Sequence, residues 1–314
     1  MFKIPSFSGA DAICMQPVRL GAKIVHIPVA DIVGKHPGKT LLVTAGMDGD
    51  EYAGIEAAYV LIEKYKDCNF AGRLIVVPIV NVPGFEAEQS LNPLDQKFPK
   101  YVHPGSKNGT STERLIFWLM ATYVSCADAW LDLHSGAITE SIYPHVWAYE
   151  TGVQSIDEKT QTFYTAVNMQ TMVVQKVGRH SRAGTLAQSG CMYVVLESGD
   201  LGKRNAVDID QHGVWTELLM HQLGMVKSAI YTESGVKKDL VIFKNIAYTL
   251  APFNGMFSVS HTAQDIRCED EVGTCRTYDS TKKQLLLATK TGRILWHKDT
   301  MAMRKGDILC AIAY

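Results

Sequence analysis

The chain has 314 residues, of which 46% are hydrophobic and 20% are charged, and its formal net charge is −1. This length can bury a large core and predicts one large domain with a smaller one. The balanced charge argues against a nucleic-acid-binding surface and against a basic membrane patch. The seven cysteines are scattered without a Cys-x-x-Cys pair, so neither a disulfide framework nor a cysteine-based zinc site is indicated. Because no secretion-type leader and no apolar stretch of membrane-spanning length is recognisable, we expect a cytoplasmic protein with no membrane partner.

Segments of strand character alternate with segments of helical period over the first 233 residues. Strands are expected at residues 22–32, 41–45, 73–80, 127–133, 143–149 and 191–196, and helices at residues 52–65, 112–124, 157–170 and 210–225, with a further helical stretch after Ala183. Such alternation predicts an α/β fold in which a mixed, mostly parallel sheet is flanked by helices.

Two regions depart from this alternation. Residues 81–110 are rich in Pro, Gly and Asn and show neither the apolar spacing of a helix nor that of a strand. A loop of that length in a compact domain is usually functional or disordered. After about Ser234 the helical period disappears, and short apolar runs alternate with turn residues, which is typical of strands. We therefore expect an α/β catalytic domain over residues 1–233 and a small C-terminal all-β domain, without catalytic groups, over residues 234–314.

A short acidic turn follows the strand expected at residues 41–45. It contains Asp48, Asp50 and Glu51, and the next helix is expected to begin at Tyr52. In open α/β sheets ligands bind at the carboxyl ends of the strands, so Asp48 and Glu51 are candidates to bind one ion. The alternative is a solvated turn whose carboxylates are favoured by the helix dipole.

Two further strands also end in ligand-type residues. His134 follows the strand at 127–133, and Glu197 follows the strand at 191–196. Taken alone, His134 is equally explained as a hydrogen-bonded turn residue. Together with Asp48 and Glu51, however, these residues match a hydrolytic zinc site, in which three protein ligands leave one position open and a nearby carboxylate acts as the base.

The three motifs that contain these residues resemble a known family. AGMDGDEYAG, DLHSG and VVLESGD are similar to the motifs of the succinylglutamate desuccinylase/aspartoacylase family, within the zinc-carboxypeptidase superfamily. Members typically carry Gly-x-His-Gly-(Asp or Asn)-Glu, whose His and Glu bind zinc, and a later His that is the third ligand. The resemblance implies a zinc-carboxypeptidase-like fold, with Asp48, Glu51 and His134 as metal ligands and Glu197 as the catalytic base.

The sequence departs from the family pattern at two places. Asp48 stands where the first zinc-binding His is expected; Asp is a legitimate zinc ligand, but a more anionic site would also accept harder ions such as Mn²⁺. The family also carries Asp-Leu-Asn-Arg before Phe-Pro-Gly, whereas the corresponding stretch here, residues 92–99, contains no Arg. Either Lys97 or a remote Arg replaces it, or the substrate differs.

Candidates for binding the substrate lie upstream of Glu197. Arg179 and Arg182 carry planar guanidinium groups that suit carboxylates, although a solvated loop before a helix also explains them. Tyr143 and His145, on the strand after DLHSG, either line the pocket or belong to the core of the sheet.

The resemblance implies a metal-dependent amidohydrolase that deacylates a small N-acylated amino acid, with one divalent ion, zinc in the first place and manganese as another option. The alternatives are a carboxypeptidase-type metallopeptidase acting on short peptides and a catalytically inactive relative that binds a small molecule. No nucleic-acid partner is expected, and assembly into a homo-oligomer is compatible with the sequence.

Overall fold

The computed structural model describes residues 12–167, 169–227, 240–261 and 263–314. Its largest element is a nine-stranded sheet with the order β1-β2-β4-β3-β5-β9-β7-β8-β10. The strands are β1 (Ile13–Leu20), β2 (Lys23–Val33), β3 (His36–Ala45), β4 (Ala71–Val77), β5 (Ala129–His134), β7 (His145–Glu150), β8 (Thr171–Lys176), β9 (Met192–Glu197) and β10 (Val241–Phe243). Parallel pairings join β4, β3, β5 and β9 at its centre, and antiparallel pairings join β1 to β2, β2 to β4 and β7 to β9.

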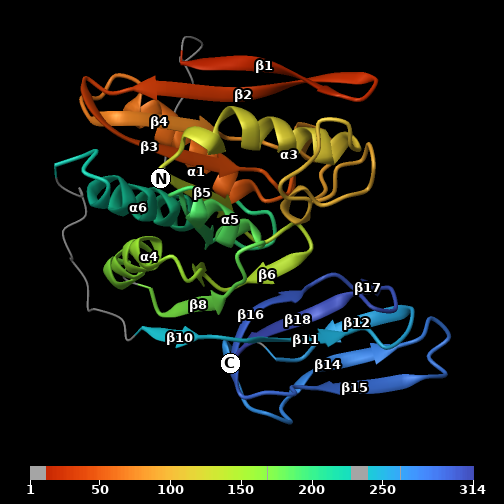
Figure 1. Cartoon of the computed structure of the whole chain (residues 1–314). Coiled ribbons are helices and arrows are strands. Elements are labelled where there is room, and N and C mark those ends of the chain that lie inside the picture. The colour runs from red at the N-terminus through yellow and green to blue at the C-terminus, as the bar shows by residue number, and fades with distance from the viewer. Residues whose placement is uncertain (1–11, 168, 228–239, 262) are drawn as a thin grey trace.

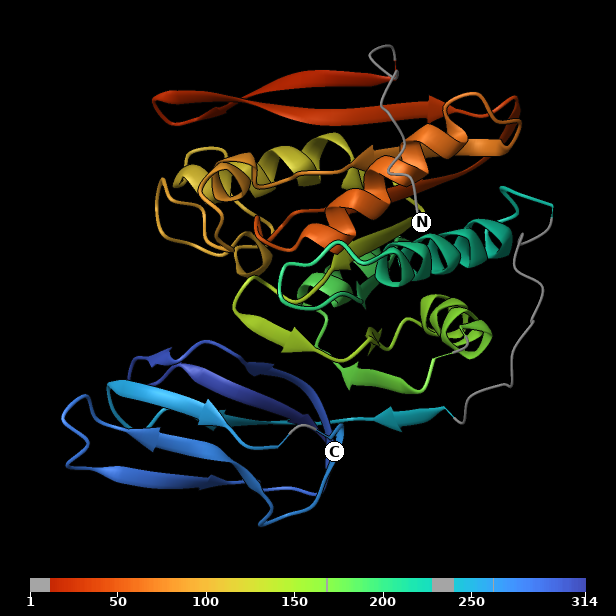
Figure 2. The ribbon, with the colours of Figure 1, turned by 180° about the vertical axis from the view of Figure 1, so that it is seen from behind.

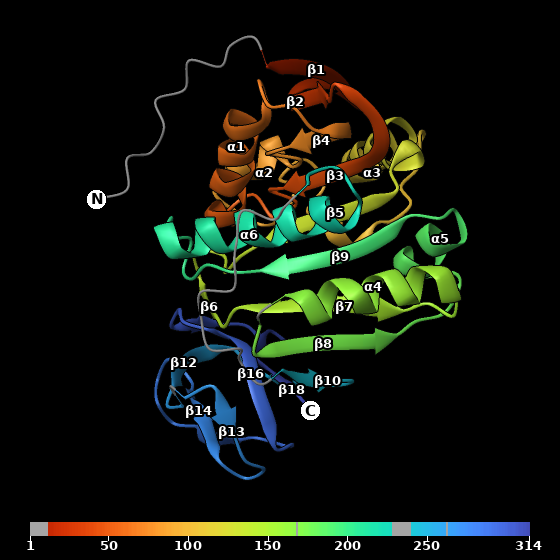
Figure 3. The ribbon, with the colours of Figure 1, turned by 90° about the vertical axis from the view of Figure 1, so that its left-hand side faces the viewer.

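Helices cover both faces of this sheet (Figure 3). One face carries α1 (Tyr52–Tyr65), α4 (Gln154–Ala166) and α6 (Ala206–Gln222), and the other carries α3 (Ser111–Thr122) and α5 (Arg182–Gln188). The short helix α2 (Val82–Glu86) and the 3₁₀ turns Pro99–Tyr101 and Val124–Cys126 lie in the connections. Because both faces are covered, the central strands are apolar on both sides: Leu131 packs in the core under α1 and α6, and Trp130 packs under α3 and α5. The predicted mixed, mostly parallel sheet flanked by helices is confirmed.

Strands β11 to β18 form two antiparallel sheets, of order β11-β18-β16-β13 and β15-β14-β12-β17. They are β11 (Ile246–Leu250), β12 (Gly255–Val259), β13 (Asp265–Ile266), β14 (Glu271–Arg276), β15 (Lys283–Leu287), β16 (Gly292–Lys298), β17 (Ala302–Met303) and β18 (Ile308–Ala313). Phe257, Ile294 and Leu309 belong to their shared core. Within residues 240–261 and 263–314 there is no α-helix, as the change in pattern predicts, whereas the boundary expected near Ser234 lies outside the described residues.

The C-terminal strands gather at the end of the molecule opposite β1 and β2 (Figures 1 and 2). Two short strands link the sheets. β6 (Glu140–Ile142) leaves the α/β part of the chain to pair with β16, and β10 precedes the C-terminal sheets yet pairs with β8.

Three strands of the large sheet, β1, β8 and the short β10, were not expected from the sequence. The helix predicted over residues 157–170 ends at Ala166, and the chain then enters β8. β1 is largely exposed on one side of its hairpin with β2, so it lacks a continuous apolar signal.

Among the described residues, no helix is long and apolar enough to cross a membrane.

Candidate active site

The candidate residues meet because β3, β5 and β9 are adjacent and parallel, which brings their carboxyl ends to one edge of the sheet. His134 ends β5 and pairs in register with Glu197, which ends β9. Asp48 lies in the turn after β3, and Glu51 is the residue that precedes the first turn of α1. Gly49 lets this turn pass close to α2, since a Cβ atom there would lie 2.2 Å from the Gly84 carbonyl carbon.

Asp48, Glu51 and His134 form a compact, buried group of potential metal ligands. One ligand atom from each lies within 4.8 Å of the others. His134 Nδ1 is 2.8 Å from Glu51 Oε2 and 3.7 Å from Asp48 Oδ2. The second Asp48 oxygen, Oδ1, is buried and has no hydrogen-bond partner within the described residues. Two carboxylates, one imidazole and an unsatisfied buried oxygen fit a divalent cation.

A second layer of hydrogen bonds orients this group. The backbone amide of Ser135 donates to Glu51 Oε2 over 3.0 Å. His134 Nε2 lies 3.3 Å from Asp132 Oδ2, and Asp132 also accepts a 2.6 Å hydrogen bond from the Thr44 hydroxyl. A carboxylate on the second nitrogen of a ligand histidine fixes the orientation of the ring and increases its basicity. Asp132 therefore belongs to the candidate site. Its position two residues before His134, on the same face of the strand, is the signal by which the sequence could have indicated it.

Burial and neighbouring charges act in opposite directions on the pKa values of these groups. Burial opposes the charge of His134, but the carboxylates of Glu51 and Asp132 outweigh it and raise its pKa well above the usual range. Burial raises the pKa of Glu51. Burial opposes the charge of Asp132 as well, but the charge and hydrogen bond of His134 keep the pKa of Asp132 below its usual value.

Glu197 lies beside this group on the neighbouring strand, and its pKa is suited to accept a proton near neutral pH. Burial raises the pKa of Glu197 to about 7, and the positive charges of His134 and Lys100 limit the rise. Glu140 lies close enough to raise it further. A general base works best when its pKa lies near the working pH.

Lys100 also reaches the site. Its ammonium group forms an ion pair with Asp48 Oδ2. Lys97, considered above as a replacement for the missing Arg, instead pairs with Glu113 at 2.7 Å. Asp95 holds the same loop by accepting a hydrogen bond from the backbone amide of Thr112 at the start of α3. Because the loop folds back in a way that no local pattern indicates, the sequence gave no reason to single out Lys100.

The structure separates the two candidate arginines. Arg182 Nη1 donates a 2.8 Å hydrogen bond to the Tyr193 hydroxyl, which in turn donates to Asp132 Oδ2 over 3.2 Å. The Arg182 guanidinium carbon lies over the rings of Trp130 and Tyr193, 5.8 and 5.4 Å from their centroids. Arg182 is thus connected through Tyr193 and Asp132 to His134. Arg179 is exposed, and its Nε donates to His180 over 3.2 Å.

His145 belongs to the core of the sheet. It is 1% exposed, its Nδ1 lies 2.7 Å from the Tyr143 carbonyl oxygen, and its Nε2 accepts a 2.6 Å hydrogen bond from Trp147. Both ring nitrogens are therefore used within the sheet.

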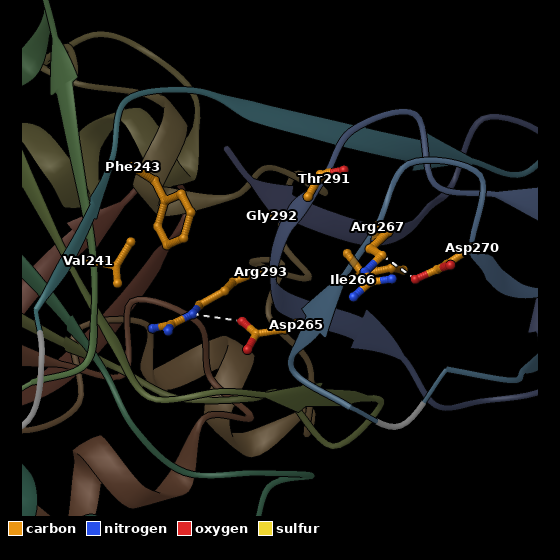
Figure 4. Close-up of a pocket in the computed structure, with 9 residues that line it drawn as sticks. All are labelled: Val241, Phe243, Asp265, Ile266, Arg267, Asp270, Thr291, Gly292 and Arg293. Carbon is orange, nitrogen blue, oxygen red and sulfur yellow. Dashed lines mark hydrogen bonds and ion pairs between the residues drawn. The ribbon is translucent and has the colours of Figure 1, made fainter.

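A separate pocket of about 500 Å³ lies between β10 and the C-terminal sheets (Figure 4). Val241 and Phe243 line one side of it, and Asp265 and Arg293, which form a 2.9 Å ion pair, face them. None of the candidate metal ligands, nor Glu197 or Arg182, lines this pocket.

The chain matches a known family and known proteins. Residues 37–222 match the model of the succinylglutamate desuccinylase/aspartoacylase catalytic domain, a range that includes Asp48, Glu51, His134 and Glu197. A 120-residue segment is 37% identical to N-alpha-acetyl-L-2,4-diaminobutyric acid deacetylase from Halomonas elongata. That segment is 38% of this chain and spans only 35% of that relative.

Solved structures match over nearly the whole chain. The succinylglutamate desuccinylase/aspartoacylase from Rhodobacter sphaeroides has a TM-score of 0.82 and 21% identity, with 96% of this chain and 94% of that chain covered. The product-bound ectoine utilization protein EutE (DoeB) from Ruegeria pomeroyi has a TM-score of 0.80 and 21% identity, with 96% and 93% covered. At this identity the match concerns the fold.

Proposed function

Because the chain belongs to the succinylglutamate desuccinylase/aspartoacylase family, we propose that it is a metal-dependent hydrolase that cleaves the amide bond of a small N-acylated amino acid. The observation that carries the proposal is the close group of Asp48, Glu51 and His134, with Glu197 in register beside His134. The name of the Halomonas elongata relative, a deacetylase of an acetylated diamino acid, supports this substrate class.

In this proposal Asp48, Glu51 and His134 hold the divalent ion, with zinc as the first candidate and manganese as the second. The chemistry that such an ion supplies when bound is Lewis acidity, which polarises a carbonyl oxygen and acidifies water. Ser135 and Asp132 keep Glu51 and His134 oriented through the contacts described above.

Glu197 is the general base of the proposed reaction. Its carboxylate takes a proton from the attacking water as the water oxygen bonds to the amide carbon. It then gives that proton to the amine nitrogen as the carbon–nitrogen bond breaks. The products are a carboxylic acid and a free amine. A pKa of about 7 allows both transfers near neutral pH.

Arg182 is the proposed binding group for the carboxylate of the amino acid. Its guanidinium is held by Tyr193 and stacked over Trp130, so a planar fork of donors is fixed in orientation, and such a fork matches a carboxylate. All of these residues lie within residues 1–233, and we propose that residues 234–314 contribute no catalytic group.

Measurements on protein purified without chelators test the proposal. Its content of zinc and manganese is measured by mass spectrometry, and release of primary amine is measured with N-acetyl and N-succinyl amino acids and with dipeptides. We expect about one ion per chain and amine release from N-acyl amino acids. Preferential cleavage of the dipeptides would instead identify a carboxypeptidase-type peptidase.

The ion pair of Asp48 with Lys100 favours a second candidate, a relative that binds a small molecule without hydrolysing it, since the ammonium engages a ligand oxygen. In that case the same protein carries no ion and releases no amine, but N-acyl amino acids still bind in calorimetric titrations.

A further inference from the structure

Two positions that depart from the family pattern contact one another. Asp48 stands where the family has a zinc-binding His, and Lys100 follows Phe98 and Pro99, where the family has the Gly of Phe-Pro-Gly. The positions are 52 residues apart in the chain, yet the Lys100 ammonium pairs with Asp48 Oδ2. Where the family pattern has an imidazole and a glycine, this chain has a carboxylate and a matching cation.

The Asp48 oxygen that Lys100 engages is the one that faces the other ligands. Oδ2 is 3.7 Å from His134 Nδ1, the nitrogen that also lies 2.8 Å from Glu51 Oε2. Ligand atoms of one zinc ion lie about 2 Å from the metal. An ion held by Oδ2 together with His134 and Glu51 would have to displace the ammonium, and an ion held by the unpartnered Oδ1 would still lie on the same carboxylate as the ammonium.

The burial of Asp48 strengthens the competition between the Lys100 ammonium and a divalent ion for its carboxylate. The Asp48 side chain is fully buried, and the Lys100 side chain is 29% exposed. An ammonium and a divalent ion that share one buried oxygen would repel each other with little screening by water. Their simultaneous presence on Oδ2 is therefore strongly unfavourable.

We infer that Lys100 and a divalent ion exclude one another at Asp48 Oδ2, so that Lys100 weakens ion binding by this chain. The inference rests on the proposed function, because it concerns the same ion site. In this proposal Lys100 lowers the affinity for the ion by occupying the Asp48 carboxylate. Glu140 and Glu197, whose charges Lys100 already influences, offer the displaced ammonium other anionic partners.

The test is a calorimetric titration of chelator-treated protein with Zn²⁺ and, separately, Mn²⁺ at one fixed pH. Lys100→Met removes the charge and the donor, and we expect its Kd for the ion to fall at least tenfold below that of the wild type. Lys107→Met is the matched control, because Lys107 is exposed in the same connection between α2 and α3, and its Kd should stay within twofold of the wild type. Heat that persists in His134→Gln belongs to other sites and is subtracted.

Thermal unfolding gives a second readout that does not depend on activity. Without an ion, Lys100→Met leaves the buried Asp48 carboxylate without its cation, so its Tm should be lower than that of the wild type. The same excess concentration of Zn²⁺ should raise the Tm of Lys100→Met more than that of the wild type, because stabilisation by a ligand grows with the logarithm of its concentration divided by Kd. If Lys100→Met does not fold, Lys100→Gln keeps a donor for Asp48 without the charge and should also bind the ion more tightly.

The outcomes separate this inference from the proposed function. If the wild type and the Lys100 variants bind the ion equally, or the variants bind it more weakly, the role of Lys100 is wrong and the ion site stands. If none of them binds either ion at millimolar concentration, the metal-dependent function itself is wrong. Binding by a Lys100 variant but not by the wild type supports the inference in its strongest form.

Discussion

His134 and Glu197 lie directly opposite one another, in register at the ends of the adjacent parallel strands β5 and β9. Side chains at paired positions of parallel strands project on the same side of the sheet. The register therefore places a candidate metal ligand and a candidate base next to each other without any contribution from a flexible loop. Sites built on strands hold their geometry more closely than sites built on loops.

Glu197→Gln tests the role of the base. The change keeps the shape of the side chain but removes its ability to take a proton, so we expect turnover to fall about 10²–10⁴-fold. Metal content should be unchanged, because Glu197 is not a proposed ligand. Glu158→Gln is the matched control, since Glu158 is exposed on α4 and its carboxylate accepts a hydrogen bond from the side chain of Gln154, far from the candidate site. Turnover near that of the wild type would remove Glu197 from the mechanism, and loss of the ion would make it a ligand.

Asp132→Asn tests the support of His134. Asp132 lies 3.3 Å from His134 Nε2 and also accepts hydrogen bonds from Thr44 and Tyr193. Loss of its charge should weaken ion binding about 10–100-fold, the usual effect of removing such a partner. Calorimetric titration with Zn²⁺ measures this, and Asp31→Asn, which alters an exposed ion pair with Arg73, should leave the Kd unchanged. An unchanged Kd in Asp132→Asn would restrict Asp132 to a structural role.

Much of the fold could be predicted because strong local patterns determine it. The helix expected over residues 52–65 is α1, Tyr52–Tyr65, since its apolar spacing agrees with its burial against the sheet. The strand ends at His134 and Glu197 were recognisable because an apolar run stops at a polar residue. β8 was missed because a polar helix runs almost directly into it.

The parts of the site that the sequence could not indicate depend on contacts between distant segments. Asp132 looks like one polar residue within an apolar strand. It lies two residues before His134 on the same face of β5, but its other partners, Thr44 and Tyr193, come from β3 and β9. Lys100 lies in an irregular loop held by Asp95 and Lys97 through contacts to α3. No period or spacing in the sequence carries information about where such a loop folds back.

Arg182→Lys tests the proposed recognition of a carboxylate. Lysine keeps the charge but loses the planar fork, the hydrogen bond to Tyr193 and the stacking on Trp130. We expect KM to rise about tenfold or more for substrates with a free carboxylate, with a smaller change in kcat and little change for the matching carboxamides. Arg179→Lys should resemble the wild type, because Arg179 is exposed and bonds to His180. Equal effects on carboxylates and carboxamides would contradict the assignment.

The last prediction concerns stability in acid and the buried imidazole of His145. Burial lowers the pKa of His145 to about 4, although the hydrogen bond to the Tyr143 carbonyl opposes the shift. Nε2 already accepts a hydrogen bond from Trp147, so a proton there would set two donors against each other. The folded protein therefore keeps this ring neutral at pH values where the unfolded chain, with an ordinary pKa of about 6.5, binds a proton.

The direction of the change in stability with pH follows from this difference between the folded and unfolded pKa values. Well above the ordinary pKa of about 6.5 the ring is neutral in both states and contributes no pH dependence. As the pH falls the unfolded chain gains a proton that the folded chain does not, so the free energy of unfolding falls by about 2 kcal/mol between pH 7.5 and pH 5. Urea unfolding at several pH values measures the change in the wild type and in His145→Gln, which cannot take up this proton. The variant is expected to start less stable at pH 7.5, because Gln does not fit both partners, but to lose about 2 kcal/mol less on acidification. Parallel stability curves for the two proteins would show that His145 does not contribute to the acid sensitivity.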